Sequence, residues 1–246
     1  MHGNWKYPVS KDQVARIAAD MDRQGFACVS DYLSENELEI LRRLAYDAGH
    51  DPTGKYAKLQ EMDTLAGTAL AALPSSPQFR TLCQQLYEFG TGSTALETHF
   101  YQVFRCLRGA VGRKNSYLFH YDSYVLTVLI PIVIPTEGER GDLLIFPNMR
   151  PMRRTYFRNL IDKILIDNPV SRIVLREAAK RRKMGAIAVT MHPGNVYFFW
   201  GYRSIHANEP CDPNQLRATA LLHFGDPYRG STVRTVLRSV RRLAAA

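Results

Sequence analysis

The hydrophobic residues of this chain change their spacing about a third of the way along it. Before that point they recur every three or four positions, which is the period of an amphipathic helix. Three helices are predicted there, and each begins after a serine: Ser10, Ser34 and Ser76. The first two serines precede a Gln or Glu by three residues, as in a capping box, and the third precedes a proline. We expect the third helix to end at Gly90 and residues 50–70 to form a long loop or lid.

Beyond Gly92 the apolar residues alternate with polar ones or form short apolar runs, and both patterns are typical of β-strands. Gly and Pro separate the runs, and no helix lies between most of them, so the pattern predicts an antiparallel sandwich or barrel. One helical and basic segment, residues 151–182, interrupts the sheet as an insertion. The predicted strands span residues 94–105, 117–134, 142–146, 186–190, 195–200, 204–208 and 217–224.

The composition is that of a folded protein. The chain has 246 residues, of which 46% are hydrophobic and 22% charged, and these values exclude a disordered or fibrous chain. No apolar run approaches the ~20 residues that cross a bilayer, and the first residues lack the apolar segment of a signal peptide. The four cysteines form no CxxC pair, which argues against a zinc site. We therefore expect a cytoplasmic protein.

The net charge of +9 is concentrated in two segments. Residues 149–183 carry eight Arg and three Lys against three acidic residues, and residues 229–242 carry five Arg and no acidic residue. Such regional charge points to an anionic partner. Nucleic acid is an unlikely partner, because few aromatic residues are interleaved with the basic ones and no nucleic-acid-binding motif is present.

Two histidines and one aspartate have the pattern of metal ligands. His120 and Asp122 lie two residues apart in a predicted strand, so their side chains project from the same face. His206 follows in a later predicted strand. Two imidazoles and one carboxylate on one face make the facial triad of non-haem Fe(II) oxygenases, which leaves three octahedral positions open.

A buried cation is predicted a short distance after His206. Arg217 lies in the apolar run Leu216–Leu222, and Thr219 shares its face of the strand. An apolar setting disfavours an exposed charge pair. A guanidinium there offers a fork that matches a carboxylate, and the hydroxyl beside it adds a donor.

In order and spacing these residues resemble the Fe(II)/2-oxoglutarate-dependent dioxygenases. The matching elements are His120-x-Asp122, Gly141-Asp-Leu-Leu-Ile-Phe-Pro147, Pro193-Gly194-Asn-Val-Tyr-Phe198, His206 and Arg217-x-Thr219. The N-terminal segments Gly25-Phe-Ala-Cys-Val29 and Tyr32-Leu-Ser-Glu-Asn-Glu-Leu38 are similar to the phytanoyl-CoA hydroxylase-like branch. The resemblance covers most of the chain but not the basic insertion or the C-terminal tail. It departs from the family after Pro147, where Asn148-Met149-Arg150 stands in place of the usual Gly-Ser-His continuation.

The resemblance implies a fold that is mainly β with flanking helices: a double-stranded β-helix, the jelly-roll or cupin-like barrel, with N-terminal helices and a helical basic insertion. It implies a single dioxygenase domain over residues 1–246. Residues 1–92 form helical support, and residues 93–228 form the jelly-roll core around the insertion at 149–183. Outside the resemblance, the spacing of apolar and basic residues over 229–246 predicts a basic amphipathic helix.

The resemblance also implies a set of cofactors and residue roles. His120, Asp122 and His206 bind Fe(II), while Arg217 pairs with the distal carboxylate of 2-oxoglutarate. The reaction is hydroxylation of an unactivated C–H bond, with 2-oxoglutarate and O₂ converted to succinate and CO₂. In the family, Thr219 would assist Arg217. Apart from the resemblance, Tyr101 is expected to contact the cosubstrate and Gln102 and Tyr117 the substrate, because they lie in strands near the ligands, and Arg153 and Arg154 are expected to contact the substrate from the basic insertion. The remaining histidines, His99, His192 and His223, are expected to be structural residues hydrogen-bonded to backbone.

The basic segments suggest the nature of the substrate. A cationic insertion near the mouth of a barrel favours a small or lipid-linked anionic substrate, against the alternative of an ordinary solvated helical face. The basic tail is expected to dock on the body of the protein or to lie on an anionic membrane surface. The enzyme would then be cytoplasmic with peripheral membrane contact.

Two other functions remain open at this stage. One is a catalytically silent jelly-roll protein that recruits a partner through the basic insertion. The other is a cupin-type metal enzyme that does not use 2-oxoglutarate. A silent relative is expected to lack a ligand or the arginine, and a cupin-type site usually carries more histidine and does not call for Arg217.

Overall fold

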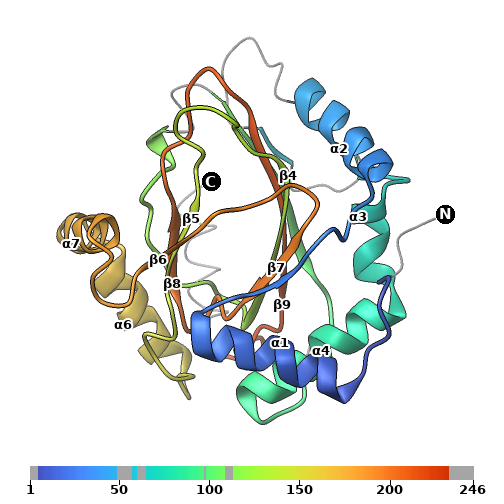
Figure 1. Ribbon diagram of the computed structural model, residues 1–246. Coiled ribbons are helices and arrows are strands. Elements are labelled where there is room, and N and C mark those ends of the chain that lie inside the picture. The colour runs from blue at the N-terminus through green and yellow to red at the C-terminus, as the bar shows by residue number, and fades with distance from the viewer. Residues whose placement is uncertain (1–4, 49–56, 60–64, 97, 109–112, 233–246) are drawn as a thin grey trace.

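Two antiparallel sheets face each other in the computed structural model, which describes residues 5–48, 57–59, 65–96, 98–108 and 113–232 (Figure 1). The larger sheet has the strand order β1-β7-β4-β9-β3-β2 and the smaller has the order β6-β5-β8. No closed barrel forms among the described residues, so the predicted jelly roll is present as two facing sheets. The strands are β1 (Ala27–Val29), β2 (Ala57–Leu59), β3 (Tyr101–Leu107), β4 (Leu126–Val133), β5 (Leu143–Phe146), β6 (Ile187–Val189), β7 (Val196–Phe199), β8 (Ile205–Asn208) and β9 (Arg217–Phe224).

The two faces of the larger sheet have different roles. The outward residues of β9 and β3, such as Ala218 and Phe104, join the core under the N-terminal helices. The inward residues of β9 are Arg217, Thr219, Leu221 and His223, and they line a cavity between the sheets. Because side chains alternate along each strand, one face of the larger sheet contributes to the hydrophobic core and the other face lines the polar cavity between the sheets.

The N-terminal helices cover the outer face of the larger sheet (Figure 1). They are α1 (Lys11–Gln24), α2 (Glu35–Ala48), the short α3 (Ala69–Ala72) with the 3₁₀ turn Leu73–Ser75, and α4 (Pro77–Thr91). Ser10, Ser34 and Ser76 cap α1, α2 and α4 as predicted, with hydroxyl oxygens that accept from backbone N–H groups three residues on. The first helix ends at Gly25, in the left-handed region.

The end of α4 and the following segment differ from the prediction. The helix continues past Gly90 and is capped by Gly92, with φ of 70°. Gly90 has a packing role instead, because a Cβ there would lie 2.8 Å from ring carbons of Trp200. Within residues 50–70, which were expected to be a loop, the described part contains β2 and the first residues of α3.

The strand predicted over residues 117–134 is shorter than expected, because β4 begins only at Leu126. The segment before it is irregular and makes one β-bridge, between His120 and His206 of β8. It lies along the free edge of β8, whose other edge is paired with β5. His120 and Asp122 therefore lie beside the sheet, whereas His206 lies within β8.

The basic insertion is helical, as predicted, and forms a hairpin of α6 (Tyr156–Ile166) and α7 (Pro169–Lys180). It lies on the outer side of the smaller sheet (Figure 1). Leu175, Ala178 and Ala179 of α7 share a core with Leu144 and Phe146 of β5. The predicted tail helix over residues 229–246 falls largely outside the described residues. Among the residues that are described, no helix has the length and apolar character needed to cross a membrane.

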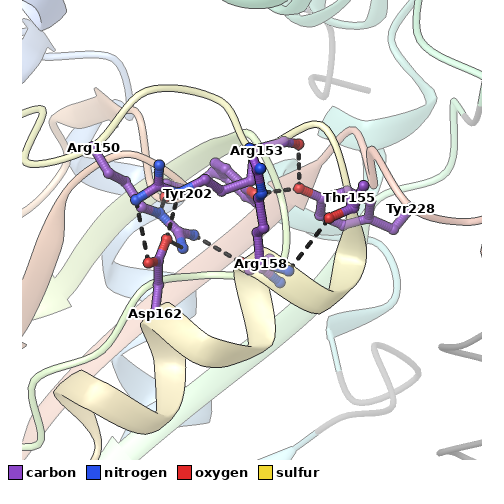
Figure 2. A network of polar contacts seen from close by, with 8 residues as sticks. Arg150, Arg153, Thr155, Arg158, Asp162, Tyr202 and Tyr228 are labelled. Atoms are coloured by element: carbon purple, nitrogen blue, oxygen red, sulfur yellow. Dashed lines mark hydrogen bonds and ion pairs between the residues drawn. The ribbon is translucent and has the colours of Figure 1, made fainter.

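A buried arginine fastens the hairpin to the sheet. Arg150 is 4% exposed and donates to Asp162 Oδ2 and Asn159 Oδ1 of α6, each at 2.8 Å (Figure 2). Its Nε donates to the carbonyl of Tyr202 at 2.8 Å, and its guanidinium stacks over the rings of Tyr121 and Tyr202. The base of the insertion is thus held by charge, hydrogen bonds and aromatic stacking together.

Candidate active site

The structure brings His120, Asp122 and His206 together from two distant segments. His120 and His206 exchange two backbone hydrogen bonds of 3.1 Å, which fixes the two residues side by side. The N–H of Asp122 donates to the carbonyl of Gly201 at 2.9 Å, in the turn between β7 and β8. Backbone pairing, and not chance proximity of side chains, therefore sets the relative positions of the three groups.

The three side chains converge on one point. One ligand atom from each lies within 4.8 Å of the other two. His120 Nε2 is 3.6 Å from Asp122 Oδ1, and His206 Nε2 is 3.4 Å from Asp122 Oδ2. Asp122 and His206 are buried, whereas the side chain of His120 is 49% exposed. The group therefore has a protected side and an open side.

Both histidines are held in the tautomer that a metal requires. Nδ1 of His120 lies 2.8 Å from the carbonyl oxygen of Leu118, and Nδ1 of His206 lies 3.1 Å from that of Ser204. A carbonyl oxygen can only accept, so each Nδ1 carries the proton and each Nε2 keeps a free lone pair. Hydrogen bonds of this kind orient metal-binding histidines and raise their basicity.

Asp122 is kept ionised. Burial by itself would raise its pKa, but interactions with the imidazoles of His206 and His223 and hydrogen bonds within the group hold the pKa well below its usual range. The hydroxyl of Thr127 donates to Asp122 Oδ2 and also contacts Nδ1 of His223. Burial lowers the pKa of His223 itself, so this imidazole favours its neutral form. The buried carboxylate is therefore a permanent anion available to a cation.

Glycine at position 201 is required by this packing. A Cβ there would lie 2.2 Å from Asp122 Oδ2 and 2.3 Å from Thr127 Oγ1, closer than any real contact. The turn between β7 and β8 can approach the carboxylate only because the residue has no side chain.

Arg217 lines the same cavity as His120, Asp122 and His206. It is 1% exposed, and its Nε donates to the carbonyl of Gly141 while Nη2 donates to Asn208 Oδ1, each at 3.0 Å. Its Nη1 is buried without a hydrogen-bond partner. Burial and the nearby charge of Arg105 lower the pKa of Arg217 to about 10, so it stays charged at neutral pH. An unpaired buried donor on a cation is costly, and an anion in the cavity would satisfy it.

Of the two expected cosubstrate residues, one lies at this cavity. Thr219 is buried and lines the cavity, opposite Arg105 in the pairing of β3 with β9. Tyr101 is not among the residues that line it, and its ring stacks on those of Tyr124 and His223.

The predicted substrate residues are more scattered. Gln102 lies on the opposite face of β3 from Arg105, toward the core under the helices. Tyr117 borders a hollow on the surface, with the guanidinium of Arg176 4.8 Å above its ring. Arg153 is paired with Asp162 at 2.7 Å in the base of the hairpin, and Arg154 is exposed. The structure therefore does not bring Gln102, Arg153 or Arg154 to the cavity.

Four contributors to the site were missed in the sequence. Arg105, Asn208, Thr127 and His223 line the cavity or contact Asp122. The alternation of β9 contained a signal for His223, which is six residues after Arg217 and hence on its face. His223 was expected to bond the backbone as a structural histidine, but its Nδ1 lies 3.1 Å from the hydroxyl of Thr127. Asn208 is two residues after His206 in β8, so the alternation of that strand contained a signal for it as well. Arg105 gave no local signal, because its role depends on which strands pair.

Comparison with solved structures shows that the chain shares its fold with known proteins. No protein-family model matches the sequence, and no curated protein matches it. Solved structures do match. A prolyl-4-hydroxylase from Pseudomonas putida is 14% identical with a TM-score of 0.54, over 92% of this chain and 98% of that chain.

Two further matches contain ligands. EctD from S. alaskensis with bound Fe is 19% identical with a TM-score of 0.54, over 90% of this chain and 79% of that one. The epimerase SnoN in complex with Fe3+, alpha ketoglutarate and nogalamycin RO is 18% identical with a TM-score of 0.53, over 88% and 85% of the two chains. Identities this low establish architecture alone. The chain therefore has the jelly-roll fold of the 2-oxoglutarate-dependent iron oxygenases, with a His-Asp-His group inside it.

Proposed function

We propose that this protein is an Fe(II)/2-oxoglutarate-dependent dioxygenase that hydroxylates an unactivated C–H bond of a small or lipid-linked anionic substrate. The observation that carries the proposal is the buried Arg217, which has an unpaired Nη1 and lines the cavity that is also lined by His120, Asp122 and His206. Within the superfamily, the N-terminal sequence pattern favours the phytanoyl-CoA hydroxylase-like branch.

The donor set fits ferrous iron. Two neutral imidazoles and one ionised carboxylate are the ligands of non-haem Fe(II) sites, and thiolates, which would favour zinc, are absent from the group. When bound with 2-oxoglutarate and O₂, the iron supplies the oxidation of the C–H bond, and 2-oxoglutarate is converted to succinate and CO₂. The exposed edge at His120 leaves room for a substrate to approach.

Residues of this chain position the cosubstrate and the metal-binding side chains, and they keep water out of the cavity. Arg217 holds one carboxylate of the cosubstrate through a charge-assisted hydrogen bond, with the hydroxyl of Thr219 beside it. Thr127 fixes the rotation of Asp122, and the carbonyls of Leu118 and Ser204 fix the two rings. Leu129, Leu143, Phe199 and Leu221 complete the wall of the cavity and exclude water from it.

Changing Arg217 tests the use of 2-oxoglutarate. We expect Arg217→Ala to raise the dissociation constant of 2-oxoglutarate by about thirtyfold or more, because a carboxylate loses its charged partner. Calorimetric titration of the Mn(II)-loaded protein with 2-oxoglutarate measures this constant. Arg217→Lys keeps the charge but not the fork, and should recover only part of the affinity.

The control for that titration is Arg23→Ala, at an exposed position on α1, which should leave the constant unchanged. Unaltered 2-oxoglutarate affinity in a folded Arg217→Ala protein would contradict the assignment and favour a cupin-type enzyme. A silent binding protein would show no 2-oxoglutarate affinity in the wild type. The intact triad and the unpaired guanidinium both argue against that alternative.

The anionic substrate is supported by a cationic path from the surface to His120. A second cavity adjoins the first at Arg105 and His120 and reaches Arg172 on α7. A surface hollow continues from Arg172 to Arg113 and Arg176. Arg113 pairs with Glu139 and Arg172 with Asp167, while Arg105 and Arg176 form no ion pair with any described carboxylate. The path therefore has an excess of positive charge along its length.

A screen of succinate release tests the charge of the substrate. We expect phosphorylated or carboxylated compounds to stimulate release, and their neutral analogues to be at least about tenfold less effective. Arg176→Gln should raise the concentration of acidic compound needed, without a change in 2-oxoglutarate affinity, since Arg176 lies outside the inner cavity. Equal stimulation by an acid and its neutral analogue would contradict an anionic substrate.

A further inference from the structure

The helical hairpin presents an apolar surface that the fold does not use. Seven large hydrophobic side chains on α6 and α7 are between 41% and 71% exposed. We propose that this surface, the apolar stripe, docks the protein on an anionic lipid bilayer. The stripe consists of Phe157, Ile161, Ile164 and Leu165 on α6 and Val170, Ile173 and Val174 on α7.

The orientation of helix α6 is the reverse of that of an ordinary surface helix. Its apolar residues are spaced at i, i+4, i+7 and i+8, which places them on one face. The opposite face carries Asn159 and Asp162, and these polar groups point inward to Arg150 (Figure 2). A helix usually buries its apolar face against the core. Here the polar face is bonded to the body, so the apolar face is left for a partner.

Helix α7 follows α6 after residues 167 and 168 and has exposed apolar residues of its own. It buries Leu175 and Ala179 against the smaller sheet, and Val170, Ile173 and Val174 lie on its other side. Isolated exposed hydrophobic residues need no explanation, but a cluster over two adjacent helices indicates a binding surface. Ile40 and Leu96, which are also exposed, lie elsewhere in the chain and serve as comparison positions.

The charge around the stripe indicates which partner it meets. Arg154, Arg158 and Arg176 are exposed and form no ion pair with a described residue. With eight Arg and three Lys against three acidic residues, the segment 149–183 would repel a second copy of itself. An apolar helix face with basic flanks suits an anionic membrane surface, where acyl chains receive the apolar groups and headgroups the cations.

The stripe lies next to the path into the active site. Ile173 borders the same surface hollow as Arg172 and Arg176. A docked bilayer would therefore lie at the mouth of that path. This part of the inference rests on the proposed function: it makes the substrate an acidic amphiphile that enters from the membrane.

Binding of the full-length protein to vesicles tests the surface. We expect the protein to cosediment with vesicles of equimolar phosphatidylcholine and phosphatidylglycerol, and only weakly with pure phosphatidylcholine. Ile164→Ser with Leu165→Ser should weaken binding at least about tenfold, because two apolar side chains no longer enter the lipid. Arg154→Gln with Arg158→Gln should weaken it by a similar factor, and only on the anionic vesicles.

The matched controls are Ile40→Ser with Leu96→Ser and Arg23→Gln with Arg43→Gln, which should bind as the wild type does. Full vesicle binding by the Ile164 and Leu165 variant would overturn the proposal and transfer the binding to another segment. Absence of vesicle binding by the wild type would also overturn the proposal. So would light scattering that shows a dimer for the wild type and a monomer for the Ile164 and Leu165 variant. Vesicle binding requires neither iron nor 2-oxoglutarate, so its failure is distinguishable from failure of the proposed function.

Discussion

Asp122→Ala is expected to lose Fe(II) affinity by more than about a hundredfold and to form no succinate. Loss of a group that merely supports a metal ligand costs about 10- to 100-fold in affinity, and Asp122 supplies the only anion in the group. The two neutral imidazoles that remain would carry no charge to oppose that of the metal. Titration with Mn(II) or Fe(II) under anaerobic conditions, followed by a succinate assay, measures both effects.

Two controls separate ligand loss from general damage. Asp20→Ala removes a partly exposed carboxylate of α1 and should change neither measurement. His206→Ala should behave as Asp122→Ala does, whereas His99→Ala, at an exposed histidine, should behave as the wild type. Succinate formation that survives in Asp122→Ala would show that the ligands have been misassigned.

Arg150→Met is expected to reduce the free energy of unfolding by about 2–4 kcal/mol. The change removes a buried guanidinium that bonds Asp162, Asn159 and the Tyr202 carbonyl, and it removes stacking on two tyrosines. The loss falls below that of a fully orphaned charge because Asp162 keeps its pairing with Arg153. Domains of this kind are stable by only about 5–15 kcal/mol, so the effect is large.

Urea unfolding followed by circular dichroism measures this effect. Arg154→Met is the matched control, since its side chain is exposed, and it should stay within about 0.5 kcal/mol of the wild type. Equal stability of Arg150→Met and Arg154→Met would mean that the hairpin is held by its apolar contacts to the sheet alone.

The sequence was most informative where a feature is local. The serine caps of α1, α2 and α4 and the helical insertion follow from residues within one or two turns of each other. The strands β5 to β9 were predicted to within about two residues, because β-rich runs stand between Gly and Pro. Gly90 was misinterpreted as a helix end, since only the tertiary position of Trp200 shows that it is a packing contact.

The grouping of His120, Asp122 and His206 was predictable from the sequence, but the residues around them were not. The His-x-Asp spacing and the apolar setting of Arg217 were visible in the chain itself. The contribution of Arg105 depends on the pairing of β3 with β9, and that of Thr127 on the approach of a turn that lies more than seventy positions further along the chain. Arg153 looked like a substrate residue because its partner Asp162 is a helix away in sequence, and only the folded hairpin joins them.

The turn between β7 and β8 bonds both the segment of Asp122 and the helical hairpin. The carbonyl of Gly201 accepts from the N–H of Asp122, and the carbonyl of the next residue, Tyr202, accepts from Arg150. Neighbouring peptide groups thus hold the backbone of Asp122 and the base of the hairpin. A displacement of the hairpin would therefore act on the same turn that positions Asp122.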